Sequence, residues 1–267
     1  MSYPLDTPLG RFGVRNFEDG PDRCVASIPA GDAVNPLTGA PTIAPLAMLV
    51  DHAGGLVNHH RRDADEWTVT SELSLELRPE AVEIIAAAPG EPVIATARPF
   101  GPKGEIALAL CELTHRDVAL ATATVRSFFI SAPDRIAPFS DGPPAPPPPI
   151  PFAEKMAVTV AESGGATQVL LQPQDPVLNN SIGIVHGGVS AMALEMVAAA
   201  AVNSGRAGAP LRTASLRVNF LREFQSGPES RYVGTALRVG RRTGIAEAQA
   251  VGADGRSAII ARVTAYR

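Results

Sequence analysis

The sequence predicts an α+β protein built from two similar units, each with several strands and one long buried helix. The first observation behind this prediction is that each half of the chain contains a long apolar segment with few charged residues, which is typical of a helix inside a core. The second is a spacing of 144 positions that places five residues of the first half on residues of similar type in the second half, which indicates a duplication. These pairs are Asn35 with Asn179, Gly39 with Gly183, Asp51 with Glu195, Ser71 with Ser215, and Arg78 with Arg222.

The elements follow from the hydrophobic pattern. In the first half, we expect short strands between residues 12 and 30, then a helix over 45–58 with Pro45 in its first turn. Alternating runs over 67–77, 93–97, 106–110 and 118–129 predict four more strands. In the second half, we expect strands over 152–161 and 168–172, a helix beginning at Gly187, and strands over 213–221, 231–239, 245–251 and 258–266.

A proline-rich segment divides the two units. Nine prolines lie between Pro133 and Pro151, so this segment can be neither a central strand nor a helix. It is typical of a stiff polyproline spacer. We therefore predict an N-terminal domain over residues 1–132, a linker over 133–151 and a C-terminal domain over 152–267.

Composition excludes several classes of function. A net charge of −4 gives no basic field for nucleic acid or an anionic membrane, and no apolar segment reaches the roughly 20 residues of a bilayer span. The N-terminus lacks the pattern of a signal peptide, so we expect a cytoplasmic protein. The two cysteines, Cys24 and Cys111, lie far apart and are expected to be buried thiols. His52, His59 and His60 lack a convincing set of partner ligands, so we predict no metal site.

The segment from Asn179 to Glu195 is the strongest candidate for a functional site. Gly187 and Gly188 form a tight turn at the start of a helix, where free N–H groups and the helix dipole can polarise a carbonyl. Glu195 is the only charged residue between Val189 and Val202, and a buried carboxylate is costly unless it is paired or functional. Both features indicate a catalytic site.

These residues resemble a known family. Asn180 lies six positions before His186-Gly187-Gly188, and the acidic Glu195 lies nine after the histidine, as in the hotdog-fold acyl-CoA thioesterases of the phenylacetate-pathway type. The segments 238–250, 252–256 and 258–263 also resemble the closing strands of that family. The resemblance implies a tandem (double) hotdog, with two curved antiparallel sheets each wrapped around a long central helix. One chain would then supply the pair that the family normally forms from two subunits.

The repeat predicts a site that crosses between the halves. The offset of 144 places Thr42-Ile43-Ala44 on His186-Gly187-Gly188, so the first half lacks the glycine turn but keeps the acidic Asp51. Gly187 and Glu195 are separated by about 12 Å along one helix, so a base must come from elsewhere. If the long helices run antiparallel, Asp51 can approach Gly187, and the resemblance implies the same crossed arrangement.

The expected chemistry is hydrolysis of an acyl-CoA thioester, with no cofactor beyond the CoA moiety of the substrate. Gly187 would polarise the thioester oxygen, and Gly188 would be part of the same substrate-binding turn. Asp51 would act as general base or as nucleophile. His186 would support the turn or serve as the base. The remaining candidates are Asn179 or Asn180 to hold the loop or the carbonyl, Ser71 and Ser215 to orient water, and Arg222, Arg241 and Arg242 to bind CoA phosphates or to remain solvated surface charges. We also expect a homo-oligomer, a dimer or a trimer of chains.

Two alternatives remain open. Gly31-Asp-Ala-Val-Asn-Pro36 faintly resembles a motif of hotdog hydratases and dehydratases, but Thr38 stands where that motif has histidine. The acid and base pair needed to eliminate water is therefore incomplete. A catalytically silent acyl-CoA-binding protein is the second alternative, because one of the two glycine turns has been lost.

Overall fold

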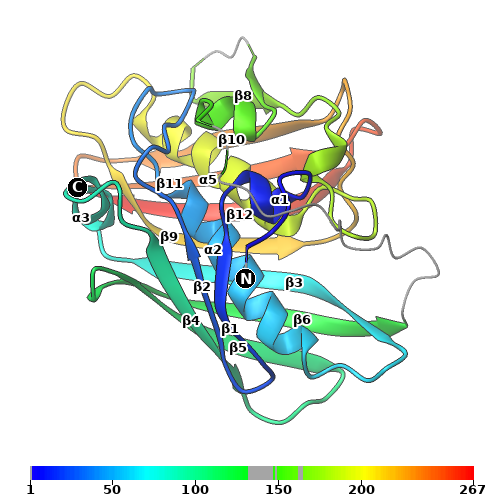
Figure 1. Ribbon diagram of the computed structural model, residues 1–267. Helices are drawn as coiled ribbons and strands as arrows, with labels where there is room; N and C mark the ends of the chain where they lie inside the picture. Colours follow the sequence, from blue (N-terminus) through cyan, green and yellow to red (C-terminus); the bar gives the residue numbers. More distant parts are fainter. Residues whose placement is uncertain (1, 132–146, 148, 162–164) are drawn as a thin grey trace.

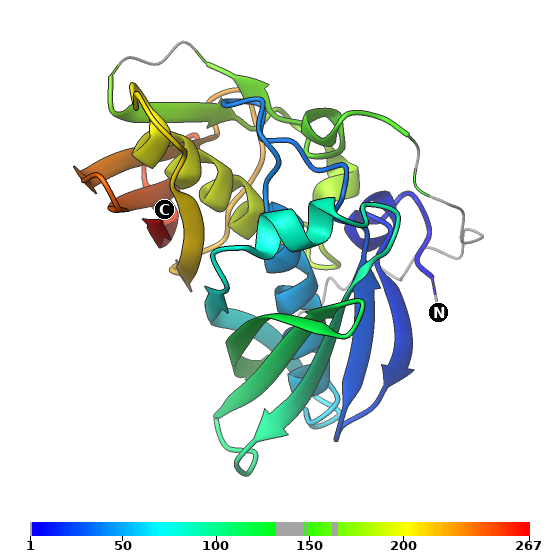
Figure 2. The same ribbon diagram turned by 90° about the vertical axis from the view of Figure 1, so that its left-hand side faces the viewer.

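A computed structural model describes residues 2–131, 147, 149–161 and 165–267. Within these residues, twelve strands form one antiparallel sheet whose two halves each curve around a long helix (Figures 1 and 2). The strands of the first half are β1 (Arg15–Asp19), β2 (Cys24–Ile28), β3 (Glu66–Leu77), β4 (Val93–Phe100), β5 (Ile106–His115) and β6 (Val118–Ser131). Those of the second are β7 (Thr159–Val160), β8 (Thr167–Leu171), β9 (Arg212–Phe220), β10 (Arg231–Val239), β11 (Thr243–Val251) and β12 (Ser257–Tyr266).

The order of the strands displays the duplication. It runs β1-β2-β4-β5-β6-β3 in the first half and β9-β12-β11-β10-β8-β7 in the second, so each half is the reverse of the other about the centre. At that centre β3 pairs antiparallel with β9, with Leu73 opposite Val218 and Leu75 opposite Leu216. The tandem α+β architecture predicted from the sequence is therefore present, and the two units share one continuous sheet.

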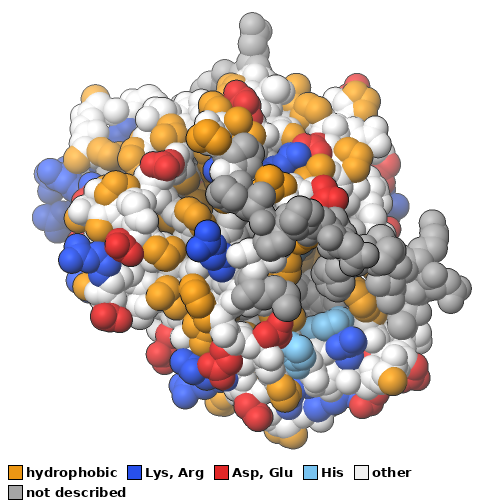
Figure 3. All heavy atoms as spheres, in the orientation of Figure 1, with side chains coloured by type: hydrophobic (Ala, Val, Ile, Leu, Met, Phe, Trp, Pro, Cys, Tyr) orange, Lys and Arg blue, Asp and Glu red, His pale blue; other side chains and the backbone are white. Residues whose placement is uncertain are grey.

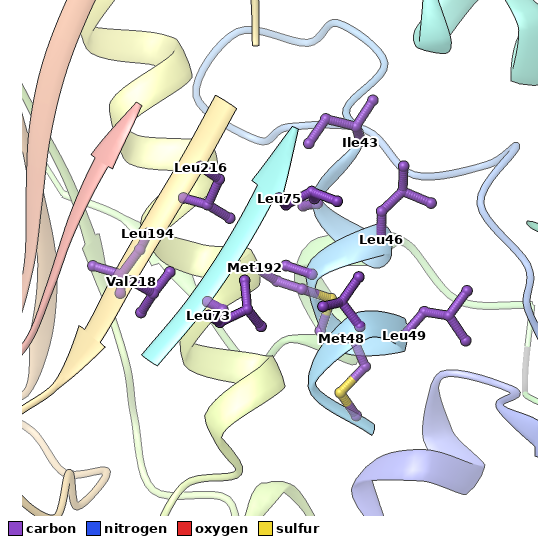
Figure 4. Close-up of a cluster of buried hydrophobic side chains, with 14 of the residues drawn as sticks. Ile43, Leu46, Met48, Leu49, Leu73, Leu75, Met192, Leu194, Leu216 and Val218 are labelled. Carbon is purple, nitrogen blue, oxygen red and sulfur yellow. The ribbon is translucent and has the colours of Figure 1, made fainter. Parts of the chain in front are cut away.

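The two long helices, α2 (Ala44–His59) and α5 (Gly187–Asn203), pack against each other inside the sheet. Gly188 lies against Met48, whereas Glu195 contacts Thr42. Residue numbers therefore increase along α5 in the direction in which they decrease along α2. This pairing shows that the helices are antiparallel. Leu73 and Leu216 from the central strands and Met48 and Met192 from the helices are fully buried in the same cluster (Figure 4).

The long elements agree with the predicted ranges within a few residues, apart from β5, which extends to His115. The strand predicted over 152–161 is wrong in its first part. Residues Phe152–Lys155 form a short helix, α4, because Pro151 caps it and Phe152 packs edge-on against Phe12 with ring centroids 6.0 Å apart. The short helices α1 (Pro8–Arg11), α3 (Ala81–Ala86) and η1 (Pro176–Leu178) were not predicted.

The domain boundaries stay a prediction. Residues 133–146 and 148 of the expected linker lie outside the described residues. In the described part of the chain, none of the helices is long and apolar enough to span a membrane.

Candidate active site

Asp51 of α2 lies beside the first turn of α5. The Thr70 hydroxyl donates a 3.0 Å hydrogen bond to Asp51 Oδ1, while Asp51 Oδ2 lies 3.5 Å from His186 Nδ1. Only 7% of the Asp51 residue is exposed, in a helix whose neighbouring residues are almost all apolar and buried. The structure thus brings together the carboxylate and the glycine turn, which are 136 residues apart (187 − 51) in the sequence.

His186 caps the helix that begins at Gly187. Its Nδ1 accepts a 3.0 Å hydrogen bond from the N–H of Gly188, so that nitrogen carries no proton and the Nε2 tautomer is favoured. Burial lowers the pKa of His186, partly opposed by the charge of Asp51, which favours the neutral ring. The contact between His186 and Asp51 is therefore not an ion pair. His186 holds the turn by capping it.

The two glycines allow α2 to approach this turn closely. A Cβ on Gly188 would lie 2.5 Å from Met48 Sδ and 2.9 Å from Met48 Cα, closer than side chains can pack. A Cβ on Gly187 would lie 3.0 Å from Asp51 Oδ2 and 3.2 Å from a ring carbon of Phe220. The N–H of Gly187 is among the donors that the first turn of a helix leaves without an intrahelical acceptor. A donor and a carboxylate thus lie together at the same point.

Asn180, rather than Asn179, shapes the loop before the turn. The Asn180 Oδ1 accepts hydrogen bonds from the N–H groups of Ile182 and Ile184, at 3.1 and 3.3 Å. The side-chain oxygen of Asn179 is buried without a hydrogen-bond partner among the described residues. In the first half Asn35 makes the same turn, since its Oδ1 accepts from Leu37 N–H at 3.0 Å. Asn35 therefore corresponds to Asn180, one position away from the predicted pairing with Asn179.

The strand serines are also out of register with the predicted pairing. Thr70, not Ser71, contacts Asp51, while the Ser71 hydroxyl donates to the carbonyl of Arg126 at 3.2 Å. In the second half the matching contact comes from Thr213, which lies next but one to Ser215. Each strand has an irregularity directly after its threonine, so Thr70 corresponds to Thr213 at an offset of 143 (213 − 70). The offset of 144 is correct for Asp51 and Glu195 but wrong for the serines.

The mirror position around Glu195 is closed. The Thr42 hydroxyl donates to Glu195 Oε2 at 2.8 Å and the Thr213 hydroxyl donates to Oε1 at 2.6 Å. Thr42 also accepts a 3.1 Å hydrogen bond from Ala44 N–H, as His186 does from Gly188. Burial raises the pKa of Glu195, which is 1% exposed. Both of its oxygens are therefore occupied, whereas at Asp51 a hydroxyl is bonded to one oxygen.

The three candidate arginines lie at two different ends of α5. Arg222 is exposed and follows Phe220, whose ring lies against the Gly187 turn. Arg241 and Arg242 lie beyond the other end of α5, where Arg206 donates to the Arg241 carbonyl. A helix of 17 residues spans about 25 Å, so the structure separates Arg241 and Arg242 from the turn. A phosphate contact by any of the three arginines stays a prediction.

Sequence reasoning missed Thr70, Thr42, Thr213 and Phe220 as parts of the two sites. Thr70 immediately precedes the candidate Ser71, and a one-residue irregularity in a strand reverses which of two adjacent side chains faces inward. The sequence therefore indicated a hydroxyl residue at this point of the strand, but only the strand pairing shows that it is the threonine.

Comparisons with known proteins give a family match for part of the chain and a fold for all of it. Residues 182–259 match the sequence model of the Thioesterase superfamily. No match is found among curated proteins. The structure resembles the tesB protein of Mycobacterium avium subs paratuberculosis, with 13% identity, coverage of 97% of each chain and a TM-score of 0.60.

Two further solved structures show the same likeness. Acyl-CoA thioesterase II TesB2 from Mycobacterium marinum has 12% identity and a TM-score of 0.61, with 97% of this chain and 96% of that one covered. A conserved protein of unknown function with hot dog fold from Alicyclobacillus acidocaldarius has 16% identity and a TM-score of 0.56, with 98% and 96% covered. The chain has the tandem hotdog fold, and its resemblance to hotdog thioesterases is confirmed. The phenylacetate-pathway subtype finds only weak support, because two of these full-length structures are named for TesB.

Proposed function

We propose that this protein hydrolyses the thioester bond of an acyl-CoA or related pantetheine substrate. One observation carries the proposal: the Asp51 carboxylate of the first half lies beside the start of α5 in the second half, where the Gly187 N–H has no intrahelical acceptor. A developing oxyanion needs fixed donors, and the attacking oxygen needs a carboxylate within reach, so hydrolysis of a carbonyl compound uses both groups. The family match over residues 182–259, which contains this turn, favours a thioester among carbonyl substrates.

In the proposed reaction each group has its own task. The N–H of Gly187 polarises the thioester oxygen and, with the helix dipole, stabilises the negative charge that forms on it. Loss of one such donor typically raises the barrier by about 2.7–4 kcal/mol. Thr70 fixes the Asp51 carboxylate through Oδ1 and leaves Oδ2 directed at the turn. His186 stays neutral and holds the turn through Gly188.

Two routes for Asp51 remain open. As a base, Asp51 removes a proton from water while the water oxygen bonds to the carbonyl carbon, and the C–S bond then breaks to release thiol and acid. As a nucleophile, Asp51 bonds to the carbonyl carbon and expels the thiolate, and water then hydrolyses the resulting anhydride. Both routes yield the same products and require the same donor at Gly187.

We further propose one working site per chain. At the mirror position Ile43 and Ala44 replace the two glycines, and Pro45 removes an N–H from the first turn of α2. The Glu195 oxygens are both engaged by threonine hydroxyls. These contacts favour a structural role for Glu195. In this proposal Arg222, which is exposed and follows Phe220 near the Gly187 turn, binds the CoA phosphates.

Thiol release from short, medium, long and aromatic acyl-CoAs tests the proposal. The parent should hydrolyse at least one class, and Asp51→Asn should lower kcat/KM by about 10²–10⁴-fold. Glu195→Gln, the matched control at the mirror position, should keep most of the activity.

An active Asp51→Asn variant with an inactive Glu195→Gln variant would overturn the crossed assignment. Binding of CoA esters without thiol release would favour the silent binding protein. Hydration of crotonyl-CoA would favour the hydratase. Asn35 of the hydratase-like segment is buried and its amide donates to the Met196 carbonyl at 2.8 Å, so it serves the packing of the two halves.

A further inference from the structure

We propose that Asp19, Cys24 and His60 form a binding site for a thiophilic divalent cation such as Zn²⁺, independent of the thioester site. One ligand atom from each residue, a carboxylate oxygen, a thiol sulfur and an imidazole nitrogen, lies within 4.8 Å of the other two. Carboxylate, thiolate and imidazole are all ligands of Zn²⁺ in proteins. The sequence predicted no metal site, because His52, His59 and His60 showed no convincing set of partner ligands. Cys24 lies 36 residues before His60 (60 − 24).

The fold places the three ligands by two separate contacts. Asp19 and Cys24 are opposite each other across the antiparallel hairpin of β1 and β2, where side chains of a pair lie about 4.5–5.5 Å apart at Cβ. His60 caps the C-terminal end of α2, and its Nε2 contacts a carboxylate oxygen of Asp19. Two ligands therefore come from the hairpin and the third from the helix that the hairpin covers.

The site is open on one side. Cys24 is 1% exposed, whereas the side chains of His60 and Asp19 are 31% and 38% exposed. Figure 3 shows histidine side chains at the surface near the lower end of α2 as drawn in Figure 1. Three protein ligands with water at the fourth position give the four-coordinate geometry common for Zn²⁺. Ca²⁺ and Mg²⁺ prefer oxygen ligands, so the thiol and the imidazole disfavour them.

The neighbouring side chains support this ligand set. The Asn16 amide lies 3.4 Å from the second carboxylate oxygen of Asp19, and it also bonds the Tyr3 hydroxyl at 2.7 Å. Such outer contacts orient a metal ligand. Asp22 within the hairpin turn adds negative charge, whereas Glu18 of β1 is paired with Arg23. The surroundings therefore favour a cation.

A bound ion would fix the edge of the sheet. β1 is the first strand of the twelve in the described sheet, and it pairs with β2 along its length while only Arg15 forms a further bridge, to Ser2. The end of the hairpin near Asp19 is therefore held in the sheet from one side. Coordination by Asp19, Cys24 and His60 would join it to the end of α2. Because the ion would bind the folded chain in preference to the unfolded one, it should raise Tm.

The test uses the full chain, freed of metal by a chelator and then titrated with Zn²⁺ in a calorimeter and with Co²⁺ in a spectrophotometer. We expect saturable binding of Zn²⁺, a rise in Tm, and a near-ultraviolet charge-transfer band from the thiolate with Co²⁺. Cys24→Ser should abolish the band, and His60→Gln should weaken Zn²⁺ binding at least about tenfold.

Cys111→Ser is the matched control. Cys111 is also buried and lies at the level of Cys24 two strands away, since both residues pair with Ala97 of β4, so it is about 10 Å distant. This variant should bind Zn²⁺ like the parent. The proposal is overturned if the parent shows no saturable binding, or if Cys24→Ser and His60→Gln bind Zn²⁺ as tightly as the parent. Since His60 is partly exposed at a helix end, His60→Gln should fold and keep the test decisive even if Cys24→Ser does not.

Discussion

Substitution of the two adjacent glycines by alanine should produce two different defects. In Gly188→Ala the new methyl would meet Met48 at 2.5 Å from Sδ and 2.9 Å from Cα, and the backbone atom cannot move without shifting α2. Overpacking of this kind costs about 1–3 kcal/mol, and the better helix propensity of alanine returns at most about 1 kcal/mol. Because a backbone atom of α2 is in the way, the cost lies at the upper end of this range, and we expect Gly188→Ala to lower the free energy of unfolding by about 2 kcal/mol.

In Gly187→Ala the methyl meets only the ends of side chains. It would lie 3.0 Å from Asp51 Oδ2 and 3.2 Å from the Phe220 ring, and both groups can move by a few tenths of an ångström. Stability should therefore change by less than about 0.5 kcal/mol. The methyl nevertheless occupies the space between the carboxylate and the turn, where the thioester carbonyl is proposed to bind. We expect kcat/KM to fall by about 10²-fold, or about 2.7 kcal/mol of barrier.

Urea unfolding and thiol-release kinetics on both variants check these values. Gly208→Ala is the control, because a Cβ there would have no neighbour within 4 Å among the described atoms. A Gly188→Ala protein as stable as the parent would refute the steric argument for the contact between the helices. Unchanged kcat/KM in Gly187→Ala would remove Gly187 from the proposed site.

Other predictions concern pH, positioning, salt and assembly. Burial lowers the pKa of His52 from 6.5 to about 3, so the folded state prefers the neutral ring. The resulting contribution to the free energy of unfolding is fully present above about pH 6.5 and is lost as the pH falls toward 3. The free energy of unfolding should fall by about 2 kcal/mol on this account between about pH 7 and pH 5, and an equal fall in His52→Gln would contradict the assignment. Thr70→Val should lower kcat/KM about tenfold to a hundredfold by removing the hydroxyl that fixes Asp51, with full activity speaking against that contact. Arg222→Ala should raise KM and flatten its salt dependence while Arg241→Ala does neither, and equal KM values in the two variants would exclude a phosphate contact at Arg222. Light scattering at micromolar concentration should show a dimer or trimer of chains, and a strict monomer would contradict this expectation.

The sequence predicted the architecture well because its strongest signals are long. Two apolar helices and most of the strands were found from the hydrophobic pattern, since a pattern that persists over ten or more residues tolerates errors at its ends. Phe152–Lys155 failed because a single turn of helix is too short to show a period of 3.6, and its form depends on the contact with Phe12.

The correspondence between residues of the two halves was predicted less accurately, for a physical reason. Helices α2 and α5 keep the offset of 144, but the loop before α5 corresponds at 145 and the strand with Thr70 at 143. One residue gained or lost in a loop or a strand irregularity changes the offset without changing the fold. A fixed offset therefore selected Ser71 and Asn179, whereas the hydrogen bonds select Thr70 and Asn180.

The positions of the arginines and the contact among Asp19, Cys24 and His60 could not be predicted from the sequence, because both depend on long-range contacts. Arg241 and Arg222 look alike in sequence, and only the position of each relative to the ends of α5 distinguishes them. Asp19, Cys24 and His60 meet because a hairpin folds over the end of a helix, which no spacing rule encodes. Long-range juxtaposition has to be seen in the fold.

The central pairing of β3 with β9 joins two units that belong to the same chain. In a dimer of identical subunits, every substitution appears at both symmetry-related positions, so a change that closes one site closes the other. In a single chain, the two positions can diverge independently, so replacement of a glycine by Ile43 in one half leaves Gly187 of the other half unchanged. The chain also keeps its halves together at any dilution, because their association is intramolecular. Gene fusion would thus have freed one of the two crossed positions to become structural, with Thr42 and Thr213 closing around Glu195, while the other kept the open carboxylate of Asp51.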